Sequence, residues 1–427
     1  MNEELMKSLR TGDLTLPEYL AQVEAHFNEL EPSMLAFVPE ENRFARLQKE
    51  ADELVEKYTD IITRPPLFGM LIGVKDIFHV DGFTTQGGSQ LPSHELQSNE
   101  AASVTNLKNA GALIMGKTVT TEFAYFNPGP TRNPYHPAHT PGGSSSGSAA
   151  AVGAGLCDLT LGTQTIGSVI RPAAFCGIVG VKPTYERISR DGVIPLSPTF
   201  DHIGFFTPDV STARLTAPSL YNDWNDSISL DKQLTLGIPD GPYLACASYY
   251  ALTCFNTICD SLTEAGYELR RVRVMDDYQE IRNRHDVIMS YDAAHVHENW
   301  FAKYENHYSP KFAELIKRGQ LITNNQLQNA LESRDDFHNQ MTQTMNDNNI
   351  DLWICPPAIG PAPKGLDSTG DPVMCLPWTQ IGFPAINIPT TKNEDGLPMG
   401  LQVVGKWNSD ESLLAWAEDI EKVVRKI

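Results

Sequence analysis

The sequence of 427 residues lacks the features of a membrane protein or a disulfide-stapled protein. It contains no run of about 18 uncharged apolar residues, which a membrane-spanning helix requires. Its first residues, Met-Asn-Glu-Glu-Leu-Met-Lys, have neither the basic nor the apolar region of a secretory signal. Its seven cysteines are scattered, and none stands in a Cys-x-x-Cys or Cys/His spacing. These absences predict a cytoplasmic protein with reduced thiols, no membrane anchor and no metal cluster.

Basic residues are also scarce. The chain has 33 lysines and arginines against 53 aspartates and glutamates, which gives a formal net charge of −20. Such a charge repels phosphate backbones and anionic bilayers, so neither nucleic acid nor a membrane is an expected partner. Apolar residues make up 41% of the chain and aromatic residues 9%, which is typical of a globular protein. The length allows one large α/β unit with additions.

Two kinds of pattern divide the chain. Residues 1–65 are predicted to form an N-terminal helical arm, because 16–30 and 42–58 carry apolar residues at helical spacing. From residue 66 onward, short apolar runs broken by glycine alternate with helical stretches, which predicts a buried sheet with helices on both faces. The predicted strands are 70–74, 112–115, 156–161, 234–238, 352–355 and 401–404.

Residues 66–427 are predicted to form one α/β domain with three segments. Residues 66–220 hold the motifs that carry chemistry, and 351–427 are expected to supply closing strands and a C-terminal helix. Residues 221–350 are rich in Asn, Gln, His and charge, which predicts a variable helical layer over the pocket. Further helices are predicted at 101–110, 149–154, 251–265 and 325–345, and a loop at 360–371.

Two serines and one lysine stand in motifs that can carry acyl-transfer chemistry. Residues 141–148 read Pro-Gly-Gly-Ser-Ser-Ser-Gly-Ser, and Ser144 within them precedes Ser168 by 24 residues. Ser168 ends the string Gly-Thr-Gln-Thr-Ile-Gly-Ser, a tight turn before a predicted helix, where backbone N–H groups can stabilise an oxyanion. Lys75 follows an apolar run, so its stem leaves the end of a buried strand. Burial lowers a lysine pKa from about 10.4, which lets the neutral amine act as a base.

Each motif also has a simpler interpretation. The Gly/Ser cluster is typical of a turn, Ser168 of a turn or cap residue, and Lys75 of a rim residue paired with Asp76. A phosphate-binding loop is disfavoured, because no Gly-Lys-Ser/Thr ends the cluster. Residues 143–147 match Gly-x-Ser-x-Gly with Ser145 as nucleophile, but the proline-rich stretch before them cannot be the strand that this elbow requires.

Together the three motifs resemble those of the amidase signature family, whose members act on amide bonds with a Ser–cis-Ser–Lys triad. The resemblance implies that Lys75 is the catalytic lysine, Ser144 the cis-serine and Ser168 the nucleophile. It also implies the family's α/β fold, a large central mixed sheet covered by helices on both faces. Other segments similar to the family are 116–124, 175–184, 382–386 and 396–402.

The resemblance further implies an oxyanion hole and substrate-binding side chains beside the nucleophile. The oxyanion hole would be formed by the backbone N–H groups of Thr165, Ile166, Gly167 and Ser168, and the substrate-binding residues would be Arg171, Gln164 and Ser145. Arg171 lies three residues after the nucleophile, close to one helical turn. Its guanidinium can therefore pair with a substrate carboxylate or form a structural salt bridge. No metal or organic cofactor is implied.

The chain departs from the family string around the nucleophile. Gln164 stands where the family has an acid, Ile166 where it has a glycine, and the arginine is shifted by one position to Arg171. The resulting Ser-Val-Ile-Arg-Pro resembles malonamidase-type hydrolases of small amides. We therefore expect an amidase that hydrolyses the C–N bond of a small, carboxylate-bearing amide through an acyl-enzyme and releases ammonia or an amine.

Three other functions stay open. A glutamine-dependent amidotransferase subunit would pass ammonia to a partner that acts on charged tRNA. A carboxylesterase can use the same triad, and a non-catalytic scaffold can keep the fold, although the intact Lys75, Ser144 and Ser168 argue against a scaffold. The oligomeric state is equally open, because the N-terminal helices can pack on their own core or on the other protomer of a homodimer.

Overall fold

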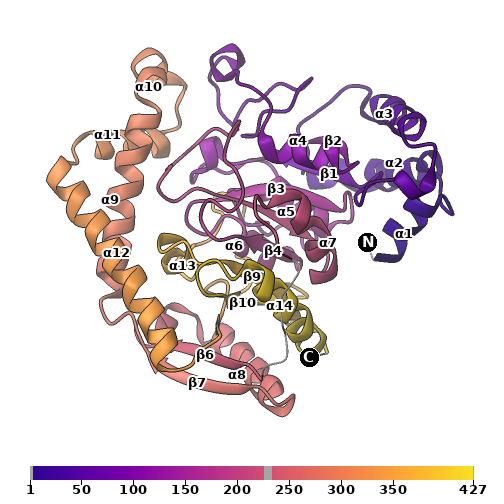
Figure 1. The fold of residues 1–427 in the computed structure, drawn as a ribbon. Helices are drawn as coiled ribbons and strands as arrows, with labels where there is room; N and C mark the ends of the chain where they lie inside the picture. The colour runs from indigo at the N-terminus through magenta and orange to yellow at the C-terminus, as the bar shows by residue number, and fades with distance from the viewer. Residues whose placement is uncertain (1–2, 226–232, 427) are drawn as a thin grey trace.

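The centre of the molecule is a large mixed sheet. The computed structural model describes residues 3–225 and 233–426, and ten strands of this part follow the order β2-β1-β3-β5-β4-β9-β10-β8-β6-β7 (Figure 1). Strands β2, β1 and β3 run parallel, as do β8, β6 and β7, and the strands between them alternate in direction. The strands are β1 (Leu71–Lys75), β2 (Leu113–Thr118), β3 (Leu159–Gln164), β4 (Val179–Lys182), β5 (His202–Thr207), β6 (Thr235–Asp240), β7 (Glu268–Arg273), β8 (Leu352–Cys355), β9 (Ala385–Lys392) and β10 (Pro398–Val404).

Helices cover both faces of this sheet. Helix α5 packs against β1, β2, β3 and β5 and against α6, whereas α7 and α14 pack on each other and on the middle of the sheet. The predicted fold class, a mixed α/β sheet with helices on both faces, is confirmed. The helices are α1 (Glu3–Thr11), α2 (Leu16–Met34), α3 (Arg43–Lys57), α4 (Ala102–Asn109), α5 (Ser146–Gly153), α6 (Ile170–Phe175), α7 (Val210–Leu220), α8 (Tyr249–Glu264), α9 (Tyr278–Val296), α10 (Glu298–Tyr304), α11 (Pro310–Gln320), α12 (Asn324–Asp347), α13 (Leu376–Gln380) and α14 (Asp410–Val424).

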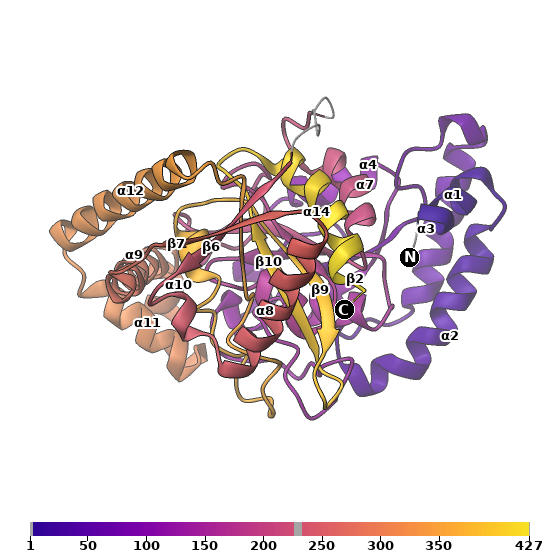
Figure 2. The same cartoon turned by 90° about the horizontal axis from the view of Figure 1, so that it is seen from below.

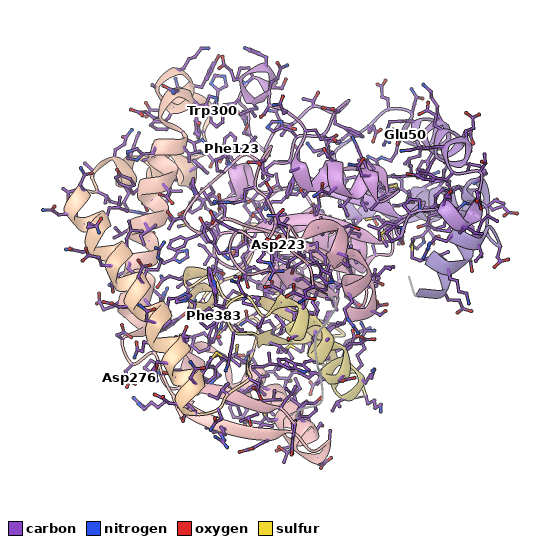
Figure 3. The ribbon with its side chains drawn as sticks, in the orientation of Figure 1. Glu50, Phe123, Asp223, Asp276, Trp300 and Phe383 are labelled. Carbon is purple, nitrogen blue, oxygen red and sulfur yellow. The ribbon has the colours of Figure 1, made fainter. Side chains whose placement is uncertain are left out.

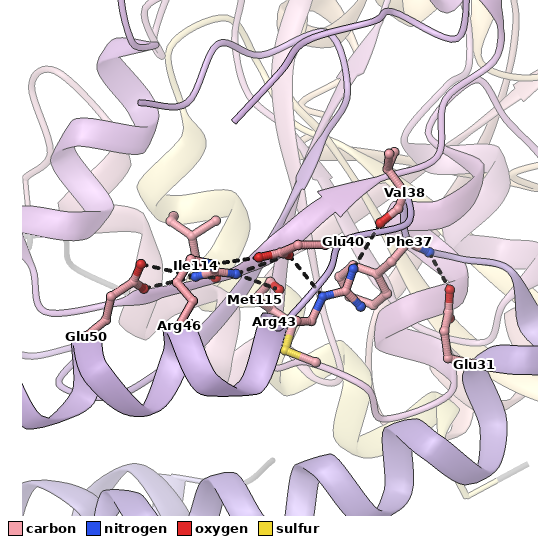
Figure 4. A network of polar contacts seen from close by, with 9 residues as sticks. All are labelled: Glu31, Phe37, Val38, Glu40, Arg43, Arg46, Glu50, Ile114 and Met115. Carbon is pink, nitrogen blue, oxygen red and sulfur yellow. Dashed lines mark hydrogen bonds and ion pairs between the residues drawn. The ribbon is translucent and has the colours of Figure 1, made fainter. Parts of the chain in front are cut away.

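Helix α3 anchors the N-terminal helices to the edge strand β2. Arg46 donates from Nη1 to the carbonyl oxygen of Ile114 at 2.9 Å (Figure 4). The carboxylate of Glu40 accepts from Arg46 at 2.6 Å and from Arg43 at 3.1 Å, so one acid holds both arginines of the helix. These contacts fix the helices beside the sheet. The boundary at residue 65 and the three segments of 66–427 stay predictions.

Helices α9 to α12 form a layer at the end of the molecule opposite α1 to α3 (Figures 1 and 2). An aromatic cluster joins this layer to the segment before α5. The Phe123 ring lies 5.5 Å from the Phe312 ring and 6.3 Å from the nearly parallel Trp300 ring (Figure 3). Phe123 and Ala124 both have left-handed backbone angles, with φ of 44° and 62°. The Phe123 side chain packs in the cluster, whereas the next residues of the segment line a cavity over the sheet.

Each of the six predicted strands overlaps an observed strand, and each predicted helix overlaps an observed helix. The loop at 360–371 carries no helix or strand. All seven cysteines are free thiols. Within the two described stretches, no helix is both long and apolar enough to cross a bilayer.

Candidate active site

Lys75 is the last residue of β1 and is fully buried. Its Nζ donates to the Ser144 hydroxyl at 2.7 Å and to the Thr163 hydroxyl at 2.7 Å. Lys75 and Asp76 do not form the ion pair of the simpler interpretation, because Asp76 pairs with Lys117 at 2.9 Å instead. Successive residues of a strand point to opposite faces of the sheet, so the two side chains diverge at this position.

Burial sets the charge state of Lys75. The loss of solvation lowers the pKa of its amine well below the usual lysine range, and the negative charge of Asp201 offsets this only in part. No carboxylate of the described residues forms an ion pair with Lys75. The amine therefore has a large neutral fraction at a pH far below the pKa of a free lysine, which is what a base requires.

Ser144 lies just before α5, and the peptide bond from Gly143 to Ser144 is cis. This is the conformation that the family resemblance implied. The Ser144 carbonyl oxygen accepts the N–H groups of Thr121 at 3.1 Å and Ser146 at 2.9 Å. The backbone is thus held from two sides while the hydroxyl faces Lys75.

Ser168 follows β3 and precedes α6, and it is only 8% exposed. It lines one narrow cavity together with Ser144. The cavity has a volume of about 10 Å³, which is room for about one water molecule. The structure therefore brings the three predicted triad residues together, since Lys75 bonds Ser144 and both serines face the same small space.

The backbone N–H groups of Thr165, Ile166, Gly167 and Ser168 have no acceptor among the described residues. The next two N–H groups along the chain do have one, because both donate to Gln164 Oε1, at 2.8 and 2.9 Å. Unpaired N–H groups beside a serine hydroxyl can stabilise the negative charge that develops on a carbonyl oxygen under attack. Of the four residues predicted to form the oxyanion hole, Thr165, Ile166 and Ser168 line the cavity and Gly167 does not, and the role stays a prediction.

Gln164 and Ser145 were expected to bind substrate, but the structure places both outside the cavity. The Gln164 amide is engaged on both sides, since its Nε2 also donates to Thr379 Oγ1 at 2.9 Å. The Ser145 hydroxyl bonds the backbone of Thr163 as donor and as acceptor, both at 3.3 Å. Both side chains hold the segments that carry the triad, and their polar atoms are turned into the protein.

Arg171 lies in α6 and is 1% exposed, with its guanidinium at the cavity. Its Nη2 donates to the Gly143 carbonyl oxygen at 2.5 Å and to Thr369 Oγ1 at 3.2 Å. Its Nε and Nη1 have no hydrogen-bond partner in the described chain, and no carboxylate there forms an ion pair with it. Burial lowers the pKa of Arg171 to about 10, so the side chain is still cationic at neutral pH. A buried cation with free donors favours an anionic ligand.

Asp201 is a further polar residue at this centre, and the sequence motifs did not identify it. Its carboxylate accepts from the Thr165 hydroxyl at 2.5 Å and from the N–H groups of Leu196 and Ser197 at 2.8 and 3.0 Å. Thr165 and Leu196 both line the cavity. Burial raises the pKa of Asp201 to about 6. The only signal in the sequence was an acid among apolar residues, directly before β5.

An enzyme of the amidase type is what this fold and this cavity indicate, since a buried lysine amine and two serines meet beside unpaired backbone N–H groups. The comparison with family models gives the same result. Residues 16–414 match the model of the family Amidase. The chain therefore belongs to the amidase signature family of enzymes.

Curated relatives extend over nearly the whole chain. A glutamyl-tRNA(Gln) amidotransferase subunit of Synechococcus sp. strain RCC307 is 30% identical, in an alignment that covers 97% of this chain and 95% of the relative. The corresponding subunit from Methanospirillum hungatei JF-1 is also 30% identical, and its alignment covers 84% of this chain and 93% of the relative. The relatives thus include proteins that are named for an amidotransferase. The resemblance to malonamidase-type hydrolases stays a prediction.

Solved structures share the fold. A crystal structure of an amidase superimposes with a TM-score of 0.89 at 29% identity and covers 99% of each chain. The 6-aminohexanoate cyclic dimer hydrolase complexed with substrate gives a TM-score of 0.86 at 20% identity, covering 99% of this chain and 96% of that one. At that identity, the second similarity shows the fold alone.

Proposed function

We propose that the chain hydrolyses a small, carboxylate-bearing amide through Lys75, Ser144 and Ser168. The observation that carries this proposal is the 2.7 Å hydrogen bond from the buried Lys75 amine to Ser144, at a cavity that also holds Ser168. The shared cavity supports a proton relay between the two serines. The same proposal places the reaction in the cytoplasm, on a dissolved substrate.

A neutral Lys75 amine determines the direction of the proton transfers in the proposed reaction. The neutral amine of Lys75 takes the proton of Ser144, and Ser144 takes the proton of Ser168 as the Ser168 oxygen attacks the amide carbonyl. The carbonyl oxygen becomes negative and accepts from the free N–H groups of residues 165–168. The C–N bond then breaks, and the relayed proton leaves with the amine. Water attacks the ester on Ser168, and the acid product is released.

Arg171 and the size of the cavity support the choice of substrate. The guanidinium is cationic and has two nitrogens without partners, so a carboxylate two or three bonds from the scissile carbonyl can pair with it. The cavity between Ser144, Ser168 and Arg171 is narrow, which favours the shortest acyl groups that carry a carboxylate. A malonamate-like monoamide of a dicarboxylic acid meets both conditions.

A second candidate is supported by the curated relatives. They are named as amidotransferase subunits, and the alignment covers 95% of the Synechococcus protein. In that function the same triad would release ammonia from glutamine and pass it to a partner protein. A purified chain that releases ammonia from simple amides without any partner would favour the hydrolase.

The experiment is a measurement of ammonia release from malonamate, succinamate, propionamide, benzamide and glutamine. It compares the wild-type chain with Ser168→Ala, and Ser33→Ala, an exposed serine at the end of α2, serves as the matched control. We expect turnover of malonamate that is lost in Ser168→Ala by several orders of magnitude and kept in Ser33→Ala. Turnover that survives in Ser168→Ala would show that the nucleophile is wrong, and turnover of glutamine alone would favour the amidotransferase.

A further inference from the structure

A second, larger cavity continues the one that holds the two serines. It has a volume of about 490 Å³, which is within the range of small-molecule sites. Tyr125, Phe126, Ile166 and Pro372 line both spaces, so the narrow inner cavity adjoins this outer one. A molecule whose reacting carbonyl reaches Ser168 has the outer cavity as the space for the rest of its structure.

One wall of the outer cavity is polar and comes from α9. Gln279, Arg282 and Asn283 lie on successive turns of this helix and line the space. Asp286 lines it too, but its carboxylate is already paired with Arg318 at 2.8 Å. Arg282 is exposed and forms no ion pair within the described residues, so its guanidinium is available to an occupant.

His285 adds a buried polar group to the same wall. It is 1% exposed, lines the cavity, and neither ring nitrogen has a hydrogen-bond partner of good geometry in the described chain. The ring stacks on Phe200 with centroids 4.1 Å apart. Burial lowers the pKa of His285 to about 3, against a smaller opposite effect of the Thr165 backbone, so the imidazole is neutral and offers one donor and one acceptor. A buried polar ring without good partners is costly unless a ligand or water satisfies it.

The opposite wall is apolar and aromatic. The rings of Tyr125 and Phe126 lie 4.8 Å apart at 64°, an edge-to-face pair, and both residues line the cavity. Val373 and Leu376, at the start of α13, extend this surface. An occupant therefore needs an apolar or aromatic body on one side and polar contacts on the other.

We propose that the outer cavity binds the amine side of an N-substituted amide, with an aromatic or compact apolar group on the amide nitrogen. The inference rests on the proposed function. A carbonyl carbon has two substituents besides its oxygen, and the short acyl chain with its carboxylate occupies the space toward Arg171. The nitrogen substituent is the remaining one, and the outer cavity shares four lining residues with the inner cavity, whereas a third cavity of about 440 Å³ shares only Ala124 and Leu196 with it. An aromatic group there packs against Tyr125 and Phe126 and can lie under the Arg282 guanidinium.

The reaction is the same acyl transfer with a larger leaving group. The Ser168 oxygen forms a bond to the carbonyl carbon, the C–N bond breaks, and the nitrogen takes the relayed proton to leave as a primary amine. Water then hydrolyses the ester on Ser168 and returns the free acid. The best substrates of this chain would thus release an amine, and ammonia release would report only on truncated substrates.

The first test compares kcat/KM for malonamate and for N-benzylmalonamate, measured by the appearance of malonate. We expect the benzyl compound to be preferred by about tenfold or more, because its ring is removed from water in the outer cavity. Equal values, or a preference for malonamate, would overturn the proposal while leaving the proposed function intact. Turnover of neither compound would overturn both, as would turnover that survives Ser168→Ala.

The second test fills the outer cavity from α9. Asn283→Trp places a large ring at an exposed position that lines the cavity, and we expect the benzyl-to-malonamate ratio to fall by about tenfold. His295→Trp is the matched control, because His295 is exposed on the same helix and does not line this cavity. An unchanged ratio in Asn283→Trp, or an equal fall in His295→Trp, would contradict the proposal. Calorimetry with Ser168→Ala gives a readout without turnover, and there the benzyl compound should bind more tightly than malonamate.

Discussion

Lys75 has two hydroxyl partners and no carboxylate partner, and this combination is what makes it usable as a base. A lysine that forms an ion pair is stabilised in its charged form and keeps its proton. Here the acid next in sequence is taken by Lys117, and the nearest negative charge, on Asp201, acts only through space. Arg171 is buried as well, but its guanidinium stays charged at neutral pH, because burial lowers its pKa only to about 10. Burial thus lowers the pKa of both basic groups of the site, and Arg171 keeps its charge at neutral pH.

The first prediction concerns the pH dependence of kcat/KM. Lys75 must be neutral to act, so activity should fall as pH drops through its pKa, and a lowered pKa puts this acidic limb well below about 10.4. Burial also lowers the pKa of Lys182 to about 7, but its amine donates to two backbone carbonyls away from the cavity. The limb should therefore persist in Lys182→Met, measured with malonamate from pH 5 to 10. A limb that vanishes in that variant would assign it to Lys182.

The second prediction separates two roles of Asp201. Its negative charge raises the pKa of Lys75, so Asp201→Asn should move the acidic limb to lower pH. Asparagine also has one acceptor oxygen where the carboxylate accepts from Thr165, Leu196 and Ser197, so kcat should fall by about tenfold or more. A positioning role without electrostatic coupling would lower kcat and leave the limb in place. Superimposable profiles with unchanged kcat would show that Asp201 has neither role.

The third prediction concerns Arg171 and the charge of the substrate. Arg171→Gln removes the cation and keeps a donor for the Gly143 carbonyl oxygen. We expect the ratio of malonamate to propionamide turnover to fall by about tenfold or more, because a charge-assisted hydrogen bond is lost for the acid only. The measurement is kcat/KM for both amides in both proteins. If the ratio does not change, the carboxylate is bound elsewhere.

At the scale of elements, the connection between α3 and β2 gives the fourth prediction. Arg46→Ala removes the donor to the Ile114 carbonyl oxygen and leaves Glu40 and Glu50 without their shared partner (Figure 4). The free energy of unfolding should fall by about 1–3 kcal/mol, measured by urea denaturation. Lys49→Ala on the same helix breaks only an exposed ion pair, so its effect should stay below about 0.5 kcal/mol. Equal effects of the two substitutions would show that the contact with β2 contributes nothing.

The strands that the sequence predicted correctly share one property, which is burial on both faces. Each residue of β1, β2 and β3 is buried, so these strands appear as short apolar runs. Strand β7 reads Glu-Leu-Arg-Arg-Val-Arg, lies at the edge of the sheet and exposes half of its residues, so an apolar run could not reveal it. Strands β4 and β5 are buried too, but their glycines leave apolar stretches of no more than two residues.

The three residues of the candidate triad could be selected from the sequence because each of them sits in a local motif. Lys75, Ser144 and Ser168 each stand in a Gly-rich string that can be recognised without knowledge of the fold. Asp201 and the outer cavity could not be found in this way. The cavity combines residues 125–126, residues of α9 and residues 371–376, which meet only through the tertiary structure. A position inside a motif is also not sufficient evidence for substrate binding. Gln164 stands inside such a motif, but its amide forms hydrogen bonds within the protein.

At the scale of the whole molecule, the candidate site lies between two parts that are formed by different segments of the chain. The sheet and its Gly-rich turns carry the triad, and the layer of α9 to α12 supplies the polar wall of the outer cavity (Figure 1). The aromatic cluster around Phe123 and Trp300 ties the layer to the segment that contains Tyr125 and Phe126. The cluster therefore joins this segment to α10 and α11, which pack against α9. Changes in α9 can alter the choice of amine without disturbing the triad.

The net charge favours the hydrolase over the amidotransferase, and tRNA binding tests this preference. Curated relatives are named for glutamyl-tRNA(Gln), yet this chain carries a formal charge of −20, which repels the phosphates of any RNA. We expect labelled tRNA to show no binding by fluorescence anisotropy at micromolar protein and about 0.15 M salt, where non-specific affinities are about 10⁻⁴–10⁻⁶ M. Added tRNA should also leave the turnover of malonamate unchanged. Micromolar binding, or ammonia release from glutamine that depends on tRNA, would instead support the amidotransferase.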